Sequence, residues 1–181
     1  SLYGLLCYYE LNRSVIQEPT ILEALNIPVL SVLPKVDALG KGYHLFQMFI
    51  EDTKSEFSEA IRSLRTIALS KFKKHKTIVI TSSFPSEGKT TIAFNLSLAL
   101  AKVNKTLFIE TDIRRPSVLK ILGEESLKLN GFSDIITGSV DFKTTLFKVP
   151  GSDLDVVTSG ERRTDLTDIT NQPKLKAFFK L

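Results

Sequence analysis

Gly88, Lys89 and Thr90 stand together at the start of an apolar segment, and their types suit the binding of phosphate. Residues 77–81 before them have the composition of a strand, and residues 90–103 have that of a helix. A loop between a strand and a helix turns backbone N–H groups and the positive end of the helix dipole toward a phosphate. Gly88 lets the chain approach closely, Lys89 adds positive charge, and the Thr90 hydroxyl can ligate Mg²⁺. The candidate nucleotide-binding residues are Ser86, Glu87, Gly88, Lys89, Thr90 and Thr91.

One position departs from the usual phosphate-loop pattern. That pattern is Gly, four residues, Gly, Lys, and then Ser or Thr, and Ser83 takes the place of its first glycine here. A Gly-Lys-Thr tripeptide alone is common by chance, and the alternative is a plain strand–turn–helix. The strand before the loop and the helix after it favour nucleotide binding.

Two carboxylates, Glu110 and Asp112, come at the end of the next predicted strand, residues 106–110. The C-terminal ends of adjacent parallel strands share one edge of a sheet, where ligands bind. Carboxylates at that edge can hold Mg²⁺ or accept a hydroxyl proton. The alternative is a surface ion pair of Glu110 with Arg114 or Arg115. The phosphate loop one strand away favours a functional site.

The spacing of apolar residues predicts the elements that position these groups. Residues 55–72 carry apolar side chains at helical spacing and leave the charges on the other face. That apolar face consists of Phe57, Ile61, Leu64 and Ala68. A strand, a helix and a strand follow one another within residues 77–110, which is a βαβ unit. The order predicts an α/β fold with a mostly parallel sheet.

The composition excludes several classes of protein. Apolar residues make up 43% of the 181 residues and charged residues 24%, as in a soluble globular domain. A net charge of +4 is too small for a dedicated nucleic-acid binder. Cys7 as the single cysteine excludes a disulfide scaffold and a cysteine zinc site, and two histidines disfavour a histidine metal site.

The two ends of the sequence predict a piece of a longer protein. Residues 1–9 are apolar and aromatic, and we expect residues 1–17 to hold the end of a transmembrane helix and a juxtamembrane segment. A buried amphipathic helix or a frayed terminus is the alternative. Residues 173–181 read as a helix that has just begun, with Pro173 in its first turn.

The segments 81–90 and 110–116 resemble the cytoplasmic domain of bacterial tyrosine kinases (BY-kinases), the autokinases of capsule and exopolysaccharide export. The resemblance continues at residues 59–65, 131–138 and 154–160. It implies a P-loop NTPase-like, three-layer α/β fold with a mostly parallel central sheet that is incomplete at the C-terminus. It also implies ATP and Mg²⁺, and a division into residues 1–17, a linker over 18–50 with a short helix and strand, and a partial kinase domain over 51–181.

The resemblance assigns a role to each matching position. Lys89 and Thr90 hold phosphates and Mg²⁺, and Asp112 serves the metal or the incoming tyrosine hydroxyl. Glu110 stands where the family normally has aspartate, so the division of work between the two carboxylates is open. The implied catalytic residues are Lys89, Glu110 and Asp112, and the implied Mg²⁺ ligands are Thr90 and Asp112. The implied oligomer interface consists of Glu59, Arg62 and Arg65, on a helix that packs neighbouring subunits in a ring.

The resemblance also implies a biological setting. The parent protein would be an autokinase at the cytoplasmic face of a bacterial inner membrane, with polysaccharide polymerase and export machinery as partners and no nucleic acid. We expect this chain alone to be at best a weak nucleotide binder, because a third motif and a tyrosine-rich tail would follow Leu181.

Two other functions compete with this interpretation. A partitioning-type P-loop ATPase has a signature lysine where Phe84 stands, which argues against that class. A non-catalytic regulatory module of polysaccharide export is compatible with Glu110.

Overall fold

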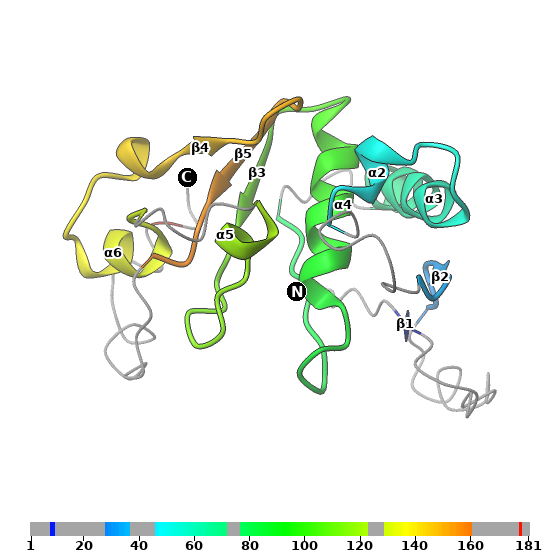
Figure 1. Ribbon diagram of the computed structural model, residues 1–181, viewed down its shortest axis with the longest axis horizontal. Coiled ribbons are helices and arrows are strands. Elements are labelled where there is room, and N and C mark those ends of the chain that lie inside the picture. The colour runs from blue at the N-terminus through cyan, green and yellow to red at the C-terminus, as the bar shows by residue number, and fades with distance from the viewer. Residues whose placement is uncertain are drawn as a thin grey trace. The chain divides into compact units, whose positions relative to one another are not determined.

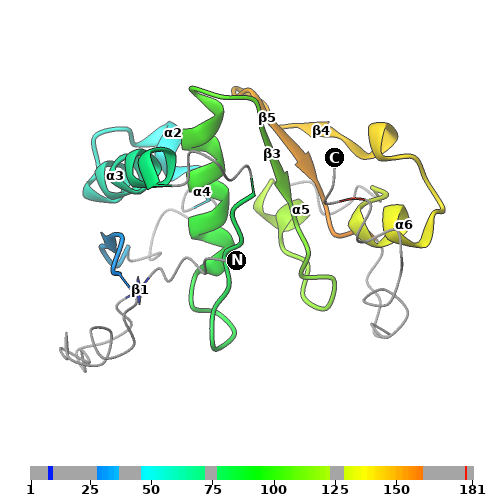
Figure 2. The same ribbon diagram turned by 180° about the vertical axis from the view of Figure 1, so that it is seen from behind.

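The computed structural model describes residues 8–9, 28–36, 46–71, 77–122, 129–160 and 178. The chain forms two compact units, Ser1–Leu100 and Ala101–Leu181. Figures 1 and 2 show the elements from opposite sides. The first unit contains β1 (Tyr8–Tyr9), β2 (Val32–Leu33), α2 (Met48–Glu51), α3 (Glu56–Lys71) and α4 (Lys89–Ala101). The second contains β3 (Thr106–Ile109), α5 (Val118–Ile121), α6 (Phe132–Thr137), the 3₁₀ helix η2 (Phe142–Thr145), β4 (Phe147–Lys148) and β5 (Leu154–Val157).

Helix α3 confirms the helical pattern predicted for residues 55–72. The predicted apolar face is buried, and none of its four side chains is more than 3% exposed. Ser55 ends the preceding turn and caps the helix, because its Oγ accepts the Ser58 N–H at 3.2 Å. Burial of one face and capping of the first turn together explain why this segment is a helix.

Helix α4 is apolar on nearly all sides, as its sequence predicts, and most of its residues are buried. Asn95 is fully buried among them and joins two helices. Its Oδ1 accepts the N–H of Phe49 at 3.0 Å, and its Nδ2 donates to the Thr91 carbonyl at 2.9 Å. The first N–H groups of a helix have no partner within it, so Asn95 on α4 supplies one for α2.

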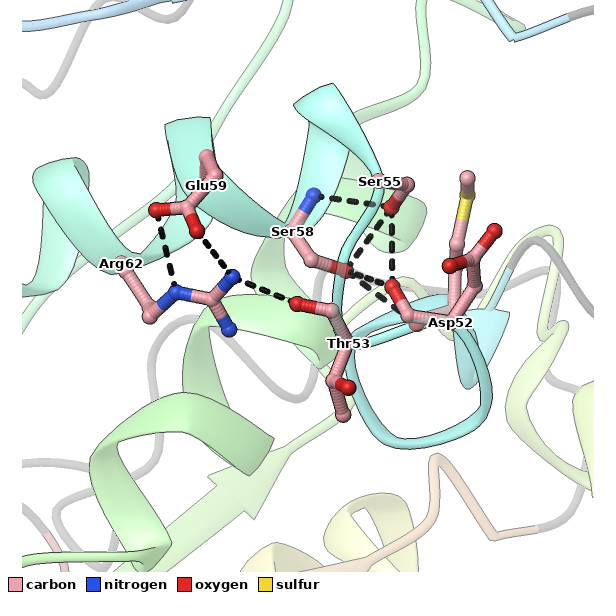
Figure 3. A network of polar contacts seen from close by, with 7 residues as sticks. Asp52, Thr53, Ser55, Ser58, Glu59 and Arg62 are labelled. Atoms are coloured by element: carbon pink, nitrogen blue, oxygen red, sulfur yellow. Dashed lines mark hydrogen bonds and ion pairs between the residues drawn. The ribbon is translucent and has the colours of Figure 1, made fainter.

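A polar network closes the turn between α2 and α3 (Figure 3). Ser58 is fully buried, and its hydroxyl lies 2.7 Å from the Asp52 carbonyl. Arg62 reaches back over the turn and donates to the Thr53 carbonyl at 2.5 Å. Side chains of α3 therefore hold the turn, and the turn keeps α2 next to α3.

The sheet of the second unit has the order β3-β5-β4. Strands β3 and β5 pair in parallel, with Thr106 opposite Leu154 and Ile109 opposite Val157. Strand β4 pairs antiparallel with β5 at the edge. The parallel pair agrees with the predicted α/β class, and the antiparallel edge makes the described sheet mixed.

The core of the second unit lies around α6. Ile113, Phe132, Ile136 and Val157 form a buried cluster. The Phe178 ring packs edge-on against the Phe132 ring, with 5.8 Å between the two centroids. The core therefore combines the end of β5, α6 and the loop after β3.

Some predicted elements differ from the structure. Residues 77–81 were expected to form a strand, but only Ile80 forms a bridge, and Val79 is 50% exposed. A strand is stable when a neighbouring strand pairs along its length, and a single bridge does not provide that. Helix α2 spans Met48–Glu51 and buries Phe49, which is 5% exposed.

Other predictions fall outside the described residues, including most of the apolar stub 1–17 and the helix near Pro173. Within the stub, Tyr8 and Tyr9 are extended and pair in parallel with Val32 and Leu33. Among the described helices, none combines the length and the apolar character needed to cross a membrane.

Candidate functional site

The phosphate-binding loop predicted from the sequence turns through two residues of left-handed conformation. Ser86 has a φ of 66° and Gly88 a φ of 83°. Gly88 adopts this conformation without strain because it has no Cβ. Ser86 has a Cβ, so its left-handed conformation costs free energy. Residues 83–86 are exposed, and residues 87–90 are half-buried. The loop therefore presents its backbone to solvent immediately before α4 begins.

Side chains of the loop hold its shape. The Ser82 Oγ donates to the Phe84 carbonyl at 3.0 Å, and the Phe84 N–H donates to Glu87 Oε2 at 2.9 Å. Glu87 was expected to contribute to nucleotide binding. Its carboxylate accepts the Phe84 N–H within the loop, and its part in nucleotide binding stays a prediction.

Lys89 is the first residue of α4, and Thr90 and Thr91 follow in its first turn. The Ile92 N–H donates to the Gly88 carbonyl at 2.9 Å, which closes that turn. α4 has 13 residues, so its N-terminal end carries an effective helix dipole. The predicted phosphate-binding residues thus lie at the positive end of a full helix.

Glu110 lies directly after β3 and is buried, at 4% exposure. Its Oε1 accepts the N–H groups of Ser117 at 2.6 Å and Val118 at 3.0 Å, and its Oε2 accepts the N–H of Ser159 at 3.2 Å. Burial raises the pKa of the Glu110 carboxyl, while the N–H donors act in the opposite direction. The surface ion pair considered as an alternative is therefore wrong, and both carboxylate oxygens have backbone partners.

Asp112 lies two residues further on in a more exposed position. Its Oδ1 accepts the Arg115 N–H at 3.0 Å, which closes a short turn. Ile113, the next residue, is buried in the core of the unit. One oxygen of Asp112 thus accepts a hydrogen bond within a local turn, and the following residue, Ile113, is held in the core.

The expected site residues divide between the two units. The loop and the start of α4 belong to the first unit, and Glu110 and Asp112 belong to the second. Among the residues that the structure describes, no cluster of three or more His, Cys, Asp or Glu side chains forms a metal site.

The three residues expected at an oligomer interface lie on α3. Glu59 and Arg62 form an ion pair of 2.6 Å, and the hydrogen bond from Arg62 lowers the pKa of Glu59. The Arg62 guanidinium carbon also lies 5.9 Å from the centre of the Phe49 ring. Arg65 donates to the Ala99 carbonyl at 3.3 Å. Arg62 and Arg65 therefore also connect α3 to α2 and to α4.

Sequence reasoning missed three groups with structural roles near the site. Ser117 and Ser159 bind Glu110 through their N–H groups, and Asn95 caps α2. Asn95 had a visible signal, because it is a single amide within an otherwise apolar helical run. Ser159 had none, since it lies 49 residues from its partner.

Comparison with solved structures defines the class of the fold. The model matches the kinase domain of the Escherichia coli tyrosine kinase ETK with a TM-score of 0.76 and 21% identity, over 91% of this chain and 68% of that one. It therefore has the α/β fold of a bacterial tyrosine-kinase domain.

Sequence comparison then identifies the relatives. The chain is 32% identical over 112 residues to the tyrosine-protein kinase YwqD of Bacillus subtilis, which is 60% of this chain and 46% of the relative. It is 26% identical over 178 residues to the tyrosine-protein kinase ptk of Acinetobacter johnsonii, which is 91% of this chain and 24% of the relative. The chain is thus a homologue of bacterial tyrosine-protein kinases, which confirms the resemblance seen in the sequence.

The match to these relatives is partial. The chain spans 46% of the length of YwqD and 24% of the length of ptk. No protein-family model matches the chain.

Proposed function

We propose that this chain is the ATP-binding part of a bacterial protein-tyrosine autokinase that regulates capsular or exopolysaccharide synthesis and export. One observation carries the proposal: α4 begins with Lys89 and Thr90 after a loop in which Ser86 and Gly88 are left-handed. That arrangement suits phosphate groups, and the homology to tyrosine-protein kinases points to ATP as their source.

The residues of the loop would bind the nucleotide in distinct ways. The N–H groups at the start of α4 and the helix dipole attract the phosphates, and the Lys89 ammonium adds a full positive charge. The oxygen donors of Thr90 and Asp112 are of the kind that Mg²⁺ prefers, and the ion would neutralise phosphate charge when bound. Glu87 keeps the loop in shape through the Phe84 N–H.

In the reaction, a tyrosine oxygen bonds to the γ-phosphorus of ATP, and the bond from that phosphorus to the bridging oxygen breaks, which releases ADP. The tyrosine hydroxyl loses its proton, and we assign Asp112 as its acceptor.

Replacing Lys89 with alanine tests this function. We expect the affinity for ATP to fall roughly 10- to 100-fold, the equivalent of about 1.5–3 kcal/mol for a hydrogen bond to a charged group. Isothermal titration measures the affinity of the chain for ATP, and transfer of labelled γ-phosphate to a tyrosine-containing polymer by the full-length parent measures the reaction.

Lys71→Ala is the matched control, because Lys71 is exposed at the end of α3. It should bind ATP like the wild type. Equal ATP affinity of the Lys89 variant, the Lys71 variant and the wild type would contradict the proposal, as would a full-length parent that leaves the label only in free phosphate.

Self-association through α3 is part of the proposal. Glu59 has a side chain 67% exposed, so it is accessible to a second copy of the chain. We expect the 20.2 kDa chain to sediment above its monomer mass at high concentration, and the Arg62→Ala variant to sediment as a monomer. The control is Arg114→Ala, an exposed arginine of the second unit. A wild type that stays monomeric at every concentration excludes this part.

The division of the chain and its location complete the proposal. Residues 1–17 would attach the protein to the inner membrane, residues 18–50 would link that attachment to the kinase domain, and the domain from residue 51 would face the cytoplasm. Polysaccharide polymerase and export machinery would be its partners.

A further inference from the structure

Hydrogen bonds from backbone N–H groups occupy both oxygens of the Glu110 carboxylate. A metal ligand or a general base needs an oxygen that is not occupied in this way. Glu110 is 4% exposed, and three N–H groups and the Ser117 hydroxyl point at its two oxygens. Its own backbone N–H continues the β3–β5 ladder by donating to the Val157 carbonyl at 2.9 Å. Both the side chain and the backbone of Glu110 are thus engaged within the second unit.

These bonds join three separate segments. Glu110 ends β3, Ser117 and Val118 begin α5, and Ser159 follows β5. Oε1 binds the start of α5, and Oε2 binds the segment after β5. That last segment is itself anchored, because the Ser133 N–H of α6 donates to the Ser159 carbonyl at 3.0 Å.

The first two of these segments are the ends of the loop that carries Asp112. The loop runs over residues 111–116, and the Glu110 carboxylate closes it at the base by binding Ser117. In the middle of the loop Ile113 is buried in the core, at 4% exposure. Asp112 therefore lies between two fixed points, Glu110 two residues before it and Ile113 directly after it.

We infer that Glu110 is a positioning residue, a carboxylate clasp that closes the 111–116 loop and so fixes the place of Asp112. The inference rests on the proposed function in one respect, the role of Asp112 in phosphoryl transfer. Glu110 itself binds neither metal nor substrate in this interpretation, which replaces the catalytic role expected for it from the sequence.

The length of the glutamate side chain matters to the clasp. Aspartate is shorter by one methylene, about 1.5 Å, and bonds of 2.6–3.2 Å stretched by that amount are no longer hydrogen bonds. Glutamine has the right length, but its NH₂ group would face N–H donors on one side of the site. The two conservative variants therefore disturb the clasp in different ways.

Amide hydrogen exchange tests the clasp without any need for activity. In Glu110→Asp we expect the amides of Ser117, Val118 and Ser159 to lose protection by about 10-fold or more, together with the Arg115 amide that binds Asp112. In Glu110→Gln, protection should be lost on one side of the carboxylate only, at Ser159 or at the start of α5. Unchanged exchange at these amides in both variants overturns the inference.

Kinetics test the positioning of Asp112. In the full-length parent we expect Glu110→Asp to lower kcat about 100-fold and to leave KM for ATP nearly unchanged, since a displacement of about 1 Å has an effect of that size on a reacting group. The matched control is Glu56→Asp on the exposed start of α3. An unchanged or increased kcat in Glu110→Asp contradicts the positioning role.

The two proposals fail in distinguishable ways. A wild-type chain that does not bind ATP contradicts the proposed function, and the exchange at Ser117, Val118, Ser159 and Arg115 still decides the clasp. If Glu110→Asp unfolds, the amides of β3 lose protection as well, and the one-sided loss expected in Glu110→Gln then decides.

Discussion

A Gly131→Ala variant is expected to lose about 3 kcal/mol or more of unfolding free energy, and to melt roughly 10 °C lower. A Cβ at residue 131 would overlap the Thr158 carbonyl oxygen and the Gly160 nitrogen, and would lie 2.7 Å from the Thr158 carbonyl carbon. All three are backbone atoms, and Thr158 is held in place by the Phe132 N–H at 2.8 Å. The clash therefore forces α6 and the segment after β5 apart.

Thermal unfolding followed by circular dichroism measures this effect. Gly151→Ala is the matched control, because no atom lies within 4 Å of a Cβ there although its φ is +71°. It should lose only about 1–2 kcal/mol from the left-handed backbone. If the two variants melt at the same temperature, the close approach of residues 131 and 158 does not limit stability.

An Asn95→Ala variant is expected to lose about 2–3 kcal/mol of unfolding free energy. The change leaves the buried Phe49 N–H without the acceptor that it has at 3.0 Å, and an unsatisfied buried donor costs about 1–3 kcal/mol. It also removes volume from a fully buried position on α4, which leaves a cavity. Chemical denaturation with urea measures the loss.

Two further variants make the Asn95 experiment specific. Asn104→Ala changes an exposed asparagine and should alter stability by less than about 0.5 kcal/mol. Asn95→Asp keeps an acceptor for Phe49 but places a charge in the core, so it should also destabilise the protein. A loss in Asn95→Ala no larger than that in Asn104→Ala would show that α2 does not depend on this contact.

Local patterns in the sequence predicted much of the fold. The apolar face of α3 follows from its period, and α4 begins at Lys89, within one residue of the predicted start. Strand β3 ends at Ile109, one residue before the predicted end. These elements depend on neighbouring residues along the chain, which a single sequence displays.

The environment of Glu110 could not be predicted in the same way. The sequence places it after a strand, where a functional carboxylate and a surface ion pair are both possible, and only the nearby phosphate loop favoured the functional site. Its burial depends on α5, a helix of four residues with a weak pattern, and on Ser159, which is distant in the sequence. Long-range contacts of this kind have no local signature, so the sequence identified Glu110 as a residue of interest but could not show its hydrogen bonds to Ser117, Val118 and Ser159.

The hydrogen bonds within the phosphate loop have a consequence for the rate of nucleotide association. Ser82 donates to the Phe84 carbonyl and Glu87 accepts the Phe84 N–H, so the loop is already folded into its turn before a ligand binds. A loop that is ordered in advance loses little conformational entropy on binding, and encounter is then limited by diffusion and not by rearrangement. Stopped-flow mixing should accordingly show a single association phase whose rate rises linearly with nucleotide concentration, without a plateau.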